Sequence, residues 1–117
     1  MKGLAGRTDS APALIAEAEV ILHLNVEVPR AKRAQFLDFC RRAFPIYERI
    51  GGNRMFLYED AANSGHFDEV GYYRTAADYS RSEDAIKNDP VQAGLIREWR
   101  GLLSAPPKVS VHHKRFP

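Results

Sequence analysis

The chain has 117 residues, which is enough for one domain with a single hydrophobic core. Its 17 basic and 15 acidic residues leave a formal net charge of +2, too small to indicate a nucleic-acid partner. No apolar run approaches the length of about 20 residues that crosses a bilayer. Residues 1–14 are too polar for a secretory signal, so we expect no membrane association and a cytoplasmic location.

The chain begins with a tail and a strand. Residues 1–18 are broken by glycine, serine and proline and are expected to form a flexible tail, with room for one helical turn near the apolar Leu14 and Ile15. Residues 19–117 are then the single domain. From residue 20 to residue 28 the even positions are all aliphatic, whereas the odd positions include His23 and Asn25. Strict alternation over this length predicts a strand with one face in the core and a second face that carries an imidazole and an amide.

A helix and a hairpin follow. Apolar side chains within residues 30–44 share one arc, which is typical of an amphipathic helix, and Pro45 is expected to bend or stop it. After a glycine pair, residues 54–59 and 67–74 alternate as two further strands, joined by the turn-forming residues 60–65.

The last third of the chain predicts helices and a strand. Thr75, with Asp78 three residues later, resembles a helix start, and Asp89-Pro90 opens another helix. An inward stripe on that helix is expected from Val91, Leu95, Trp99 and Leu102. Residues 108–114 alternate again as a final strand. Cys40, which has no partner for a disulfide or a CxxC motif, is expected to be a small buried hydrophobe.

The order strand, helix, strand, strand, helix, strand is that of the ferredoxin-like α+β fold, with a four-stranded antiparallel sheet and both helices on one face. The helices are expected to cover Val20, Leu22, Leu24, Met55, Leu57, Val70, Val109 and Val111. The opposite face then carries Ile21, His23, Asn25, Phe56, Tyr58, Glu69, Tyr73, Ser110 and His112. Because this second face is too aromatic to stay in water, we expect a homodimer packed sheet to sheet around a pocket.

Three features of the sequence carry a family resemblance: the Gly51-Gly52 pair, the run EVGYYRTAADY from Glu69 and the helix that begins at Asp89-Pro90. Through them the sequence resembles the dimeric α+β barrel superfamily over about residues 19–114, and within it the antibiotic-biosynthesis monooxygenase and NIPSNAP groups. The resemblance implies a pocket inside the barrel that works without metal, flavin or any other cofactor. The monooxygenase group often has Asn and Trp where this chain has Asn25 and Tyr73. Residues 76–88 lack the haem-ligating histidine of haem-degrading relatives.

The candidate catalytic residues are His23, Tyr73 and His112. If the two histidines share the cavity, one could take a proton from a substrate carbon or phenol, and Tyr58 or Tyr73 could donate a hydrogen bond to the resulting oxyanion. Asn25, Phe56, Tyr58 and Glu69 are the candidate ligand-binding residues.

Structural interpretations compete with these roles. His23 could be a hydrogen-bonded interface residue, and Asn25 could satisfy backbone or partner groups. For Glu69, pairing with Arg54 on the adjacent strand is favoured. His113 replaces His112 in the pocket if a bulge intervenes. The spacing of the histidines is not that of a zinc site, so no metal is expected.

Three classes of function remain. A cofactor-independent enzyme acting on an aromatic or polyketide-like molecule, by proton transfer or by reaction with oxygen, is favoured over a non-catalytic dimer that binds a small molecule. The third class is an RNA-binding domain, because Gly71-Tyr72-Tyr73 resembles the third-strand motif of the RRM family. Glu27 and Glu69, if exposed on the sheet, argue against RNA.

Overall fold

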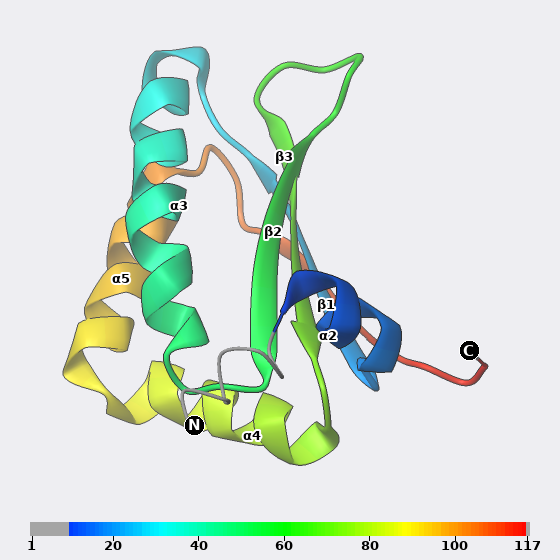
Figure 1. The fold of residues 1–117 in the computed structure, drawn as a ribbon. Helices are drawn as coiled ribbons and strands as arrows, with labels where there is room; N and C mark the ends of the chain where they lie inside the picture. Colours follow the sequence, from blue (N-terminus) through cyan, green and yellow to red (C-terminus); the bar gives the residue numbers. More distant parts are fainter. Residues whose placement is uncertain (1–9, 117) are drawn as a thin grey trace.

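The computed structural model describes residues 10–116 of the chain (Figure 1). Its elements follow one another as α2 (Ala11–Glu17), β1 (Val20–Glu27), the short 3-10 helix η1 (Arg30–Lys32), α3 (Arg33–Glu48), β2 (Asn53–Glu59), β3 (His66–Tyr73), α4 (Ala76–Asn88), α5 (Pro90–Leu102) and β4 (Lys108–His113). Within the described part of the chain, no helix is long and apolar enough to span a membrane.

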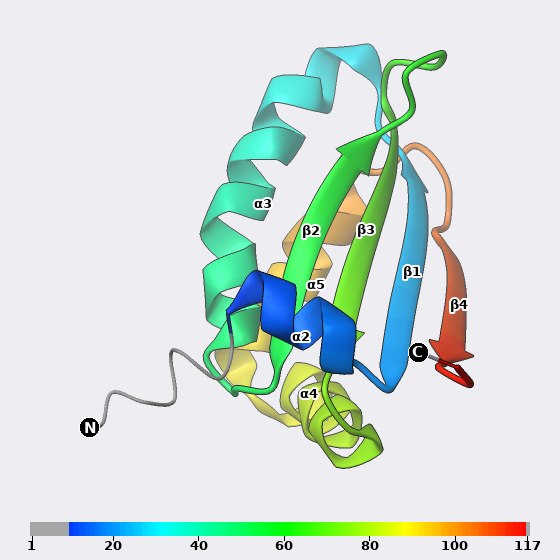
Figure 2. The ribbon, with the colours of Figure 1, turned by 45° about the vertical axis from the view of Figure 1, so that its right-hand side comes forward.

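The four strands form one antiparallel sheet in the order β2-β3-β1-β4. Helices α3 and α5 lie on one side of this sheet, and α4 packs against α5 at one end (Figures 1 and 2). The predicted ferredoxin-like α+β fold is therefore confirmed. We call the side that α3 and α5 cover the helix face, and the opposite side the open face.

Local sequence signals set the boundaries of the last two helices. The Thr75 hydroxyl accepts a hydrogen bond from the Asp78 backbone N–H, and the Asp78 carboxylate accepts one from the Thr75 N–H, which makes a capping box. Asp89 accepts from the Val91 N–H and Pro90 takes the first helical position. Both predicted starts are confirmed, because each satisfies helix N–H groups that would otherwise have no partner.

Pro45, which was expected to bend or stop the first long helix, does not stop it. Helix α3 runs through Pro45 to Glu48. Ile46 and Tyr47, which follow the proline, pack against the hydrophobic core. This packing holds the last turn in place although the proline has no N–H to donate. The helix ends before Gly51 and Gly52, whose positive φ angles of 86° and 73° reverse the chain.

Part of the predicted flexible tail is also helical. Residues 1–9 lie outside the described structure, but helix α2 forms from Ala11 to Glu17 on the side of the sheet opposite α3 and α5, where it contacts β2 and β3 (Figure 2). Leu14 is completely buried, Glu17 pairs with Arg74 at 3.4 Å, and the Lys114 ammonium donates to the Ala16 carbonyl. These contacts order a segment that is too short to be stable as an isolated helix.

The core fills the space between the helix face and α3 and α5. Phe36, Phe39 and Cys40 of α3 are buried there, together with Trp99 of α5 and Phe67 of β3. Cys40 is thus the buried hydrophobe that the sequence predicted.

Three valines expected to point inward remain exposed. Val91, in the first turn of α5, is 57 % exposed, although Leu95, Trp99 and Leu102 of the same predicted stripe are buried. Val109 and Val111 are exposed because β4 is an edge strand that lies beyond the helices.

Strand β3 places its side chains on the faces opposite to those predicted. Its buried Phe67 packs against Phe36 at 4.8 Å between ring centroids, so Phe67, Glu69 and Tyr73 lie on the helix face. Val70, expected under the helices, instead lies on the open face opposite His23. The expected placement of Glu69 and Tyr73 on the open face is therefore wrong. Burying a large aromatic ring stabilises the fold more than burying one valine, so Phe67 decides which side of β3 points toward the helices.

Candidate functional site

Two histidines meet on the open face. His23 comes from β1, His112 comes from the edge strand β4, and Ser110 lies directly opposite His23 in the register. The two rings are 5.1 Å apart between centroids with an interplanar angle of 75°, an edge-to-face contact. The His112 Nε2 lies 3.3 Å from the Ser110 hydroxyl. The structure therefore brings the predicted pair together, and the regular β4 register places His112, not His113, on this face.

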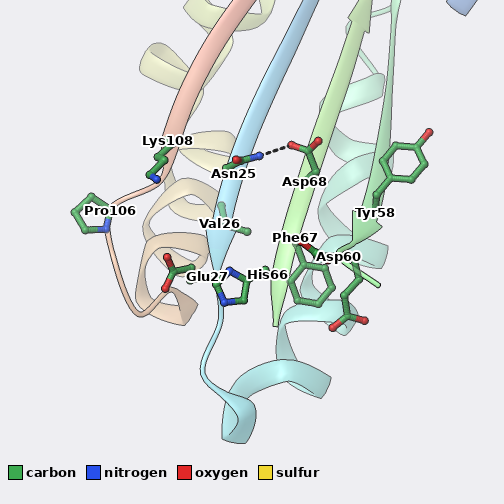
Figure 3. Close-up of a pocket in the computed structure, with 11 residues that line it drawn as sticks. Asn25, Val26, Glu27, Tyr58, Asp60, His66, Phe67, Asp68, Pro106 and Lys108 are labelled. Atoms are coloured by element: carbon green, nitrogen blue, oxygen red, sulfur yellow. Dashed lines mark hydrogen bonds between the residues drawn. The ribbon is translucent and has the colours of Figure 1, made fainter. Parts of the chain in front are cut away.

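A carboxylate and an amide complete this polar cluster. Asn25 and Asp68 lie opposite each other on β1 and β3, and the Asn25 Nδ2 donates to the Asp68 Oδ1 at 2.7 Å (Figure 3). The other carboxylate oxygen, Oδ2, lies 3.6 Å from the His23 Nδ1. We call Asp68, His23, Asn25, Ser110 and His112 the open-face cluster. It combines an acceptor-only carboxylate with two groups that can move protons.

Two adjoining hollows border the cluster. One, of about 340 Å³, is lined by His23, Asn25, Lys108, Val109, Ser110 and His112. The other, of about 390 Å³, is shown in Figure 3 and is lined by Asn25, Val26, Glu27, Tyr58, Glu59, Asp60, His66, Phe67, Asp68, Pro106 and Lys108. Asn25 and Lys108 border both hollows, which are therefore neighbouring parts of one surface. Each is in the size range of small-molecule sites, and each is open to the solvent.

Aromatic side chains extend the same face toward β2. The rings of Phe56 and Tyr72 are in edge contact at 5.7 Å. Tyr58, two residues after Phe56 on β2, is 52 % exposed. Phe56 and Tyr58 therefore lie on the predicted face, and Tyr72 occupies the aromatic position that the sequence had suggested for Tyr73.

Tyr73 and Glu69 are buried among the helices instead. Tyr73 packs edge-on against Tyr79 of α4, and burial raises the pKa of its hydroxyl. Glu69 is 3 % exposed and accepts a hydrogen bond from the Trp99 Nε1 at 2.5 Å. Burial raises the pKa of the Glu69 carboxyl to about 7, although the indole hydrogen bond acts in the opposite direction. The expected ion pair of Glu69 with Arg54 is wrong, because Arg54 lies opposite Tyr72 and so on the other face of the sheet from Glu69. Arg54 lies 3.3 Å from Glu48.

The open-face residues that the sequence analysis did not name are Asp68 and Tyr72. With Val70 taken as an inward residue of β3, the alternation of the strand leaves both on the helix face. Phe67 would have given the correct alternation, because it is the larger apolar side chain at that end of the strand.

No metal centre is apparent in residues 10–116. No group of three or more histidine, cysteine, aspartate or glutamate side chains in this part of the chain is arranged to hold a metal ion.

Comparison of the sequence with family models and with curated proteins gives no match. The structure, in contrast, is similar to several solved structures. SnoaB from Streptomyces nogalater, a cofactor-independent oxygenase, has a TM-score of 0.72 at 16 % identity, over 86 % of this chain and 96 % of its own.

Two further structures show the same likeness. A Nitrosomonas europaea protein classed with the antibiotic biosynthesis monooxygenases gives a TM-score of 0.70 at 15 % identity, over 83 % of this chain and 99 % of its own. A conserved protein from Methanosarcina mazei Go1 gives 0.74 at 11 % identity, over 86 % and 96 %. The chain therefore has the α+β fold of the antibiotic biosynthesis monooxygenase-like proteins, which is the fold that the sequence resemblance predicted.

Proposed function

We propose that this chain forms a homodimer through its open face and acts there as a cofactor-independent enzyme on an aromatic small molecule. The observation that carries the proposal is the contact of His23 with His112 beside the Asn25–Asp68 pair, on a sheet face that α3 and α5 leave uncovered. The fold shared with a cofactor-independent oxygenase supports the same class of reaction.

A second copy is the simplest cover for the part of this face that α2 leaves exposed. Phe56 and Tyr72 lie on it as an aromatic pair, and the neighbouring hollows are open toward the solvent. Packing against another open face would bury the rings and convert the hollows into an enclosed chamber. Enclosure would also strengthen the electrostatic interactions of the cluster, because it excludes water.

Within such a chamber, His23 is the proposed general base. Its imidazole would take a proton from a phenolic or activated carbon substrate, and the hydroxyl of Tyr58 would donate a hydrogen bond to the oxyanion that forms. The aromatic pair of Phe56 and Tyr72 would contact the ring of the substrate. Deprotonation makes an aromatic substrate electron-rich, so the same step suits reaction with oxygen as well as isomerisation or cyclisation.

The dimer is tested by the size of the protein in solution. Sedimentation of the full chain is expected to show a dimer, and Phe56→Arg, which places a charge on the open face, is expected to give monomers. Val91→Arg is the matched control, because Val91 is exposed on α5, away from the open face. A native chain that stays monomeric at all concentrations would contradict the proposal.

The reaction is tested with a panel of quinols and polyketide-like phenols, following oxygen uptake and product mass. We expect His23→Ala to lower kcat by about 100-fold or more. His113→Ala, a substitution of the same kind on the other face of β4, should leave the rate unchanged. Saturable binding of these compounds without turnover would replace the enzyme by the second candidate, a non-catalytic small-molecule-binding dimer.

A further inference from the structure

We infer that Asp68 is a positioning residue that holds His23 as the Nδ1–H tautomer, so that its Nε2 is free to accept a proton. The inference rests on the proposed role of His23 as a base. It goes beyond that role by naming the group that would set the protonation pattern of the ring.

The two oxygens of Asp68 face different partners. Oδ1 accepts the 2.7 Å hydrogen bond from the Asn25 Nδ2, which fixes the plane of the carboxylate between β1 and β3. Oδ2 is thereby left 3.6 Å from the His23 Nδ1. A carboxylate is only an acceptor of hydrogen bonds when ionised, so a lone pair on Nδ1 facing it would be repelled and an N–H would be attracted.

No other acid competes for this ring. Among the described residues 10–116, Asp68 is the only carboxylate within ion-pair distance of His23. The remaining contact of the ring is with His112, and the directly opposite β-sheet neighbours are Val70 and Ser110. Asp68 is therefore the carboxylate in the described part of the chain that can select between the two neutral forms of the imidazole.

This arrangement accounts for the whole proton transfer. The substrate O–H or C–H bond breaks, its electron pair stays on the substrate, and the proton forms a new N–H bond at the His23 Nε2. The resulting imidazolium carries a positive charge next to the Asp68 carboxylate, which stays ionised. Asn25 would act through Asp68, since its amide holds the carboxylate in place.

The tautomer can be measured without substrate. Long-range ¹H–¹⁵N correlation spectra of the ligand-free full chain, recorded at a pH high enough to leave histidines neutral, distinguish a protonated Nδ1 from a protonated Nε2. We expect His23 to be mainly Nδ1–H in the native protein. In Asp68→Ala it should revert to mainly Nε2–H, the form that free histidine prefers in water.

Asp84→Asn is the matched control, because it removes the same charge from an exposed position on α4. It should leave the His23 spectrum unchanged. Asp68→Asn, which keeps the shape of the side chain, guards against a misfolded alanine variant and should also lower the Nδ1–H population. A native His23 that is mainly Nε2–H, or one that does not respond to either Asp68 substitution, would overturn the inference.

Kinetics separate this inference from the proposed function. With a turned-over substrate, both Asp68 variants should lower kcat by roughly 10- to 100-fold with little change in KM, because a positioning residue acts on the base and not on substrate binding. If the tautomer responds as expected but His23→Ala retains full activity, the positioning of the ring stands and the role of His23 as base is wrong.

Discussion

Asp68 and Glu69 are consecutive carboxylic acids on one strand, yet they lie in opposite environments. Asp68 is on the open face, half-exposed, and accepts a hydrogen bond from an amide next to an imidazole. Glu69 is on the helix face, buried, and accepts one hydrogen bond from an indole. The alternation of the strand alone therefore gives one acid a place in a solvent-accessible cluster and the other a place in the core.

The difference shows that the two faces of the sheet have different tasks. The helix face holds the large buried rings, and its buried carboxyl, that of Glu69, has a pKa raised by burial. The open face holds groups that can exchange protons with a ligand. Substitutions on the helix face should therefore change stability, and substitutions on the open face should change association and activity. The three predictions that follow test this division.

The largest effect is expected from the core. Phe36→Ala removes a completely buried ring that contacts Phe67. It should lower the free energy of unfolding by about 3–5 kcal/mol, measured by urea denaturation. Phe56→Ala on the open face should cost less, and its cost should shrink on dilution, because in the proposed dimer the second copy covers the ring and dilution separates the two copies. Equal, concentration-independent losses for the two variants would show that the faces do not differ in this way.

A smaller effect is expected from the pH dependence of stability. The pKa of Glu69 is raised from 4.5 to about 7 in the folded chain, so the folded state holds its proton where the unfolded state has lost it. The contribution of Glu69 to stability is therefore fully present below pH 4.5 and is lost as the pH rises toward 7. Between about pH 5 and pH 8 the loss should amount to about 2–3 kcal/mol, measured by urea denaturation at both values.

Glu69→Gln identifies the source of that slope. The amide does not titrate and its oxygen can still accept from the Trp99 Nε1, so stability should become nearly independent of pH in this range. Asp84→Asn is the control and should keep the slope. Glu59, whose pKa is lowered to about 2 by Arg33, affects stability only in more acidic solution, where its contribution is lost as the pH falls. A slope that persists in Glu69→Gln would assign the titration to another group.

The smallest effect is expected at the start of α4. Thr75→Ala removes one half of the capping box and should lower the free energy of unfolding by about 1 kcal/mol. Ser80→Ala, at an exposed position of the same helix, should be neutral or slightly stabilising because alanine favours helix. The NMR signals of His23 and His112 should be unchanged in both variants. A shift of these signals in Thr75→Ala alone would indicate that the cap also affects the open face.

Much of the fold was predictable because its signals are local. The alternation in β1 identifies both faces of that strand, and the Thr75 and Asp89 caps mark two helix starts within hydrogen-bonding reach of their own backbone. Helix α2 and the continuation of α3 beyond Pro45 were not predictable in this way. Both are stabilised by contacts with distant residues, such as that between Lys114 and Ala16.

The candidate site was only partly predictable. His23 and Asn25 follow from the regular pattern of β1, and His112 from that of β4. Strand β3 has apolar or aromatic residues on both faces, so its pattern does not say which face is inward. The partnership of Asp68 with His23 and Asn25 depends on that choice.

The sequence by itself determined the order of the elements, their principal boundaries and the α+β topology, because these depend on periodicity and on side chains close to their own backbone. Only the tertiary structure decided which carboxylate joins the histidines. The packing of Phe67 against Phe36 sets the orientation of β3, and that contact joins residues far apart in the chain. A shift of β3 by one residue relative to its neighbouring strands would turn every side chain of the strand over, and would exchange Asp68 and Glu69 between the open face and the core.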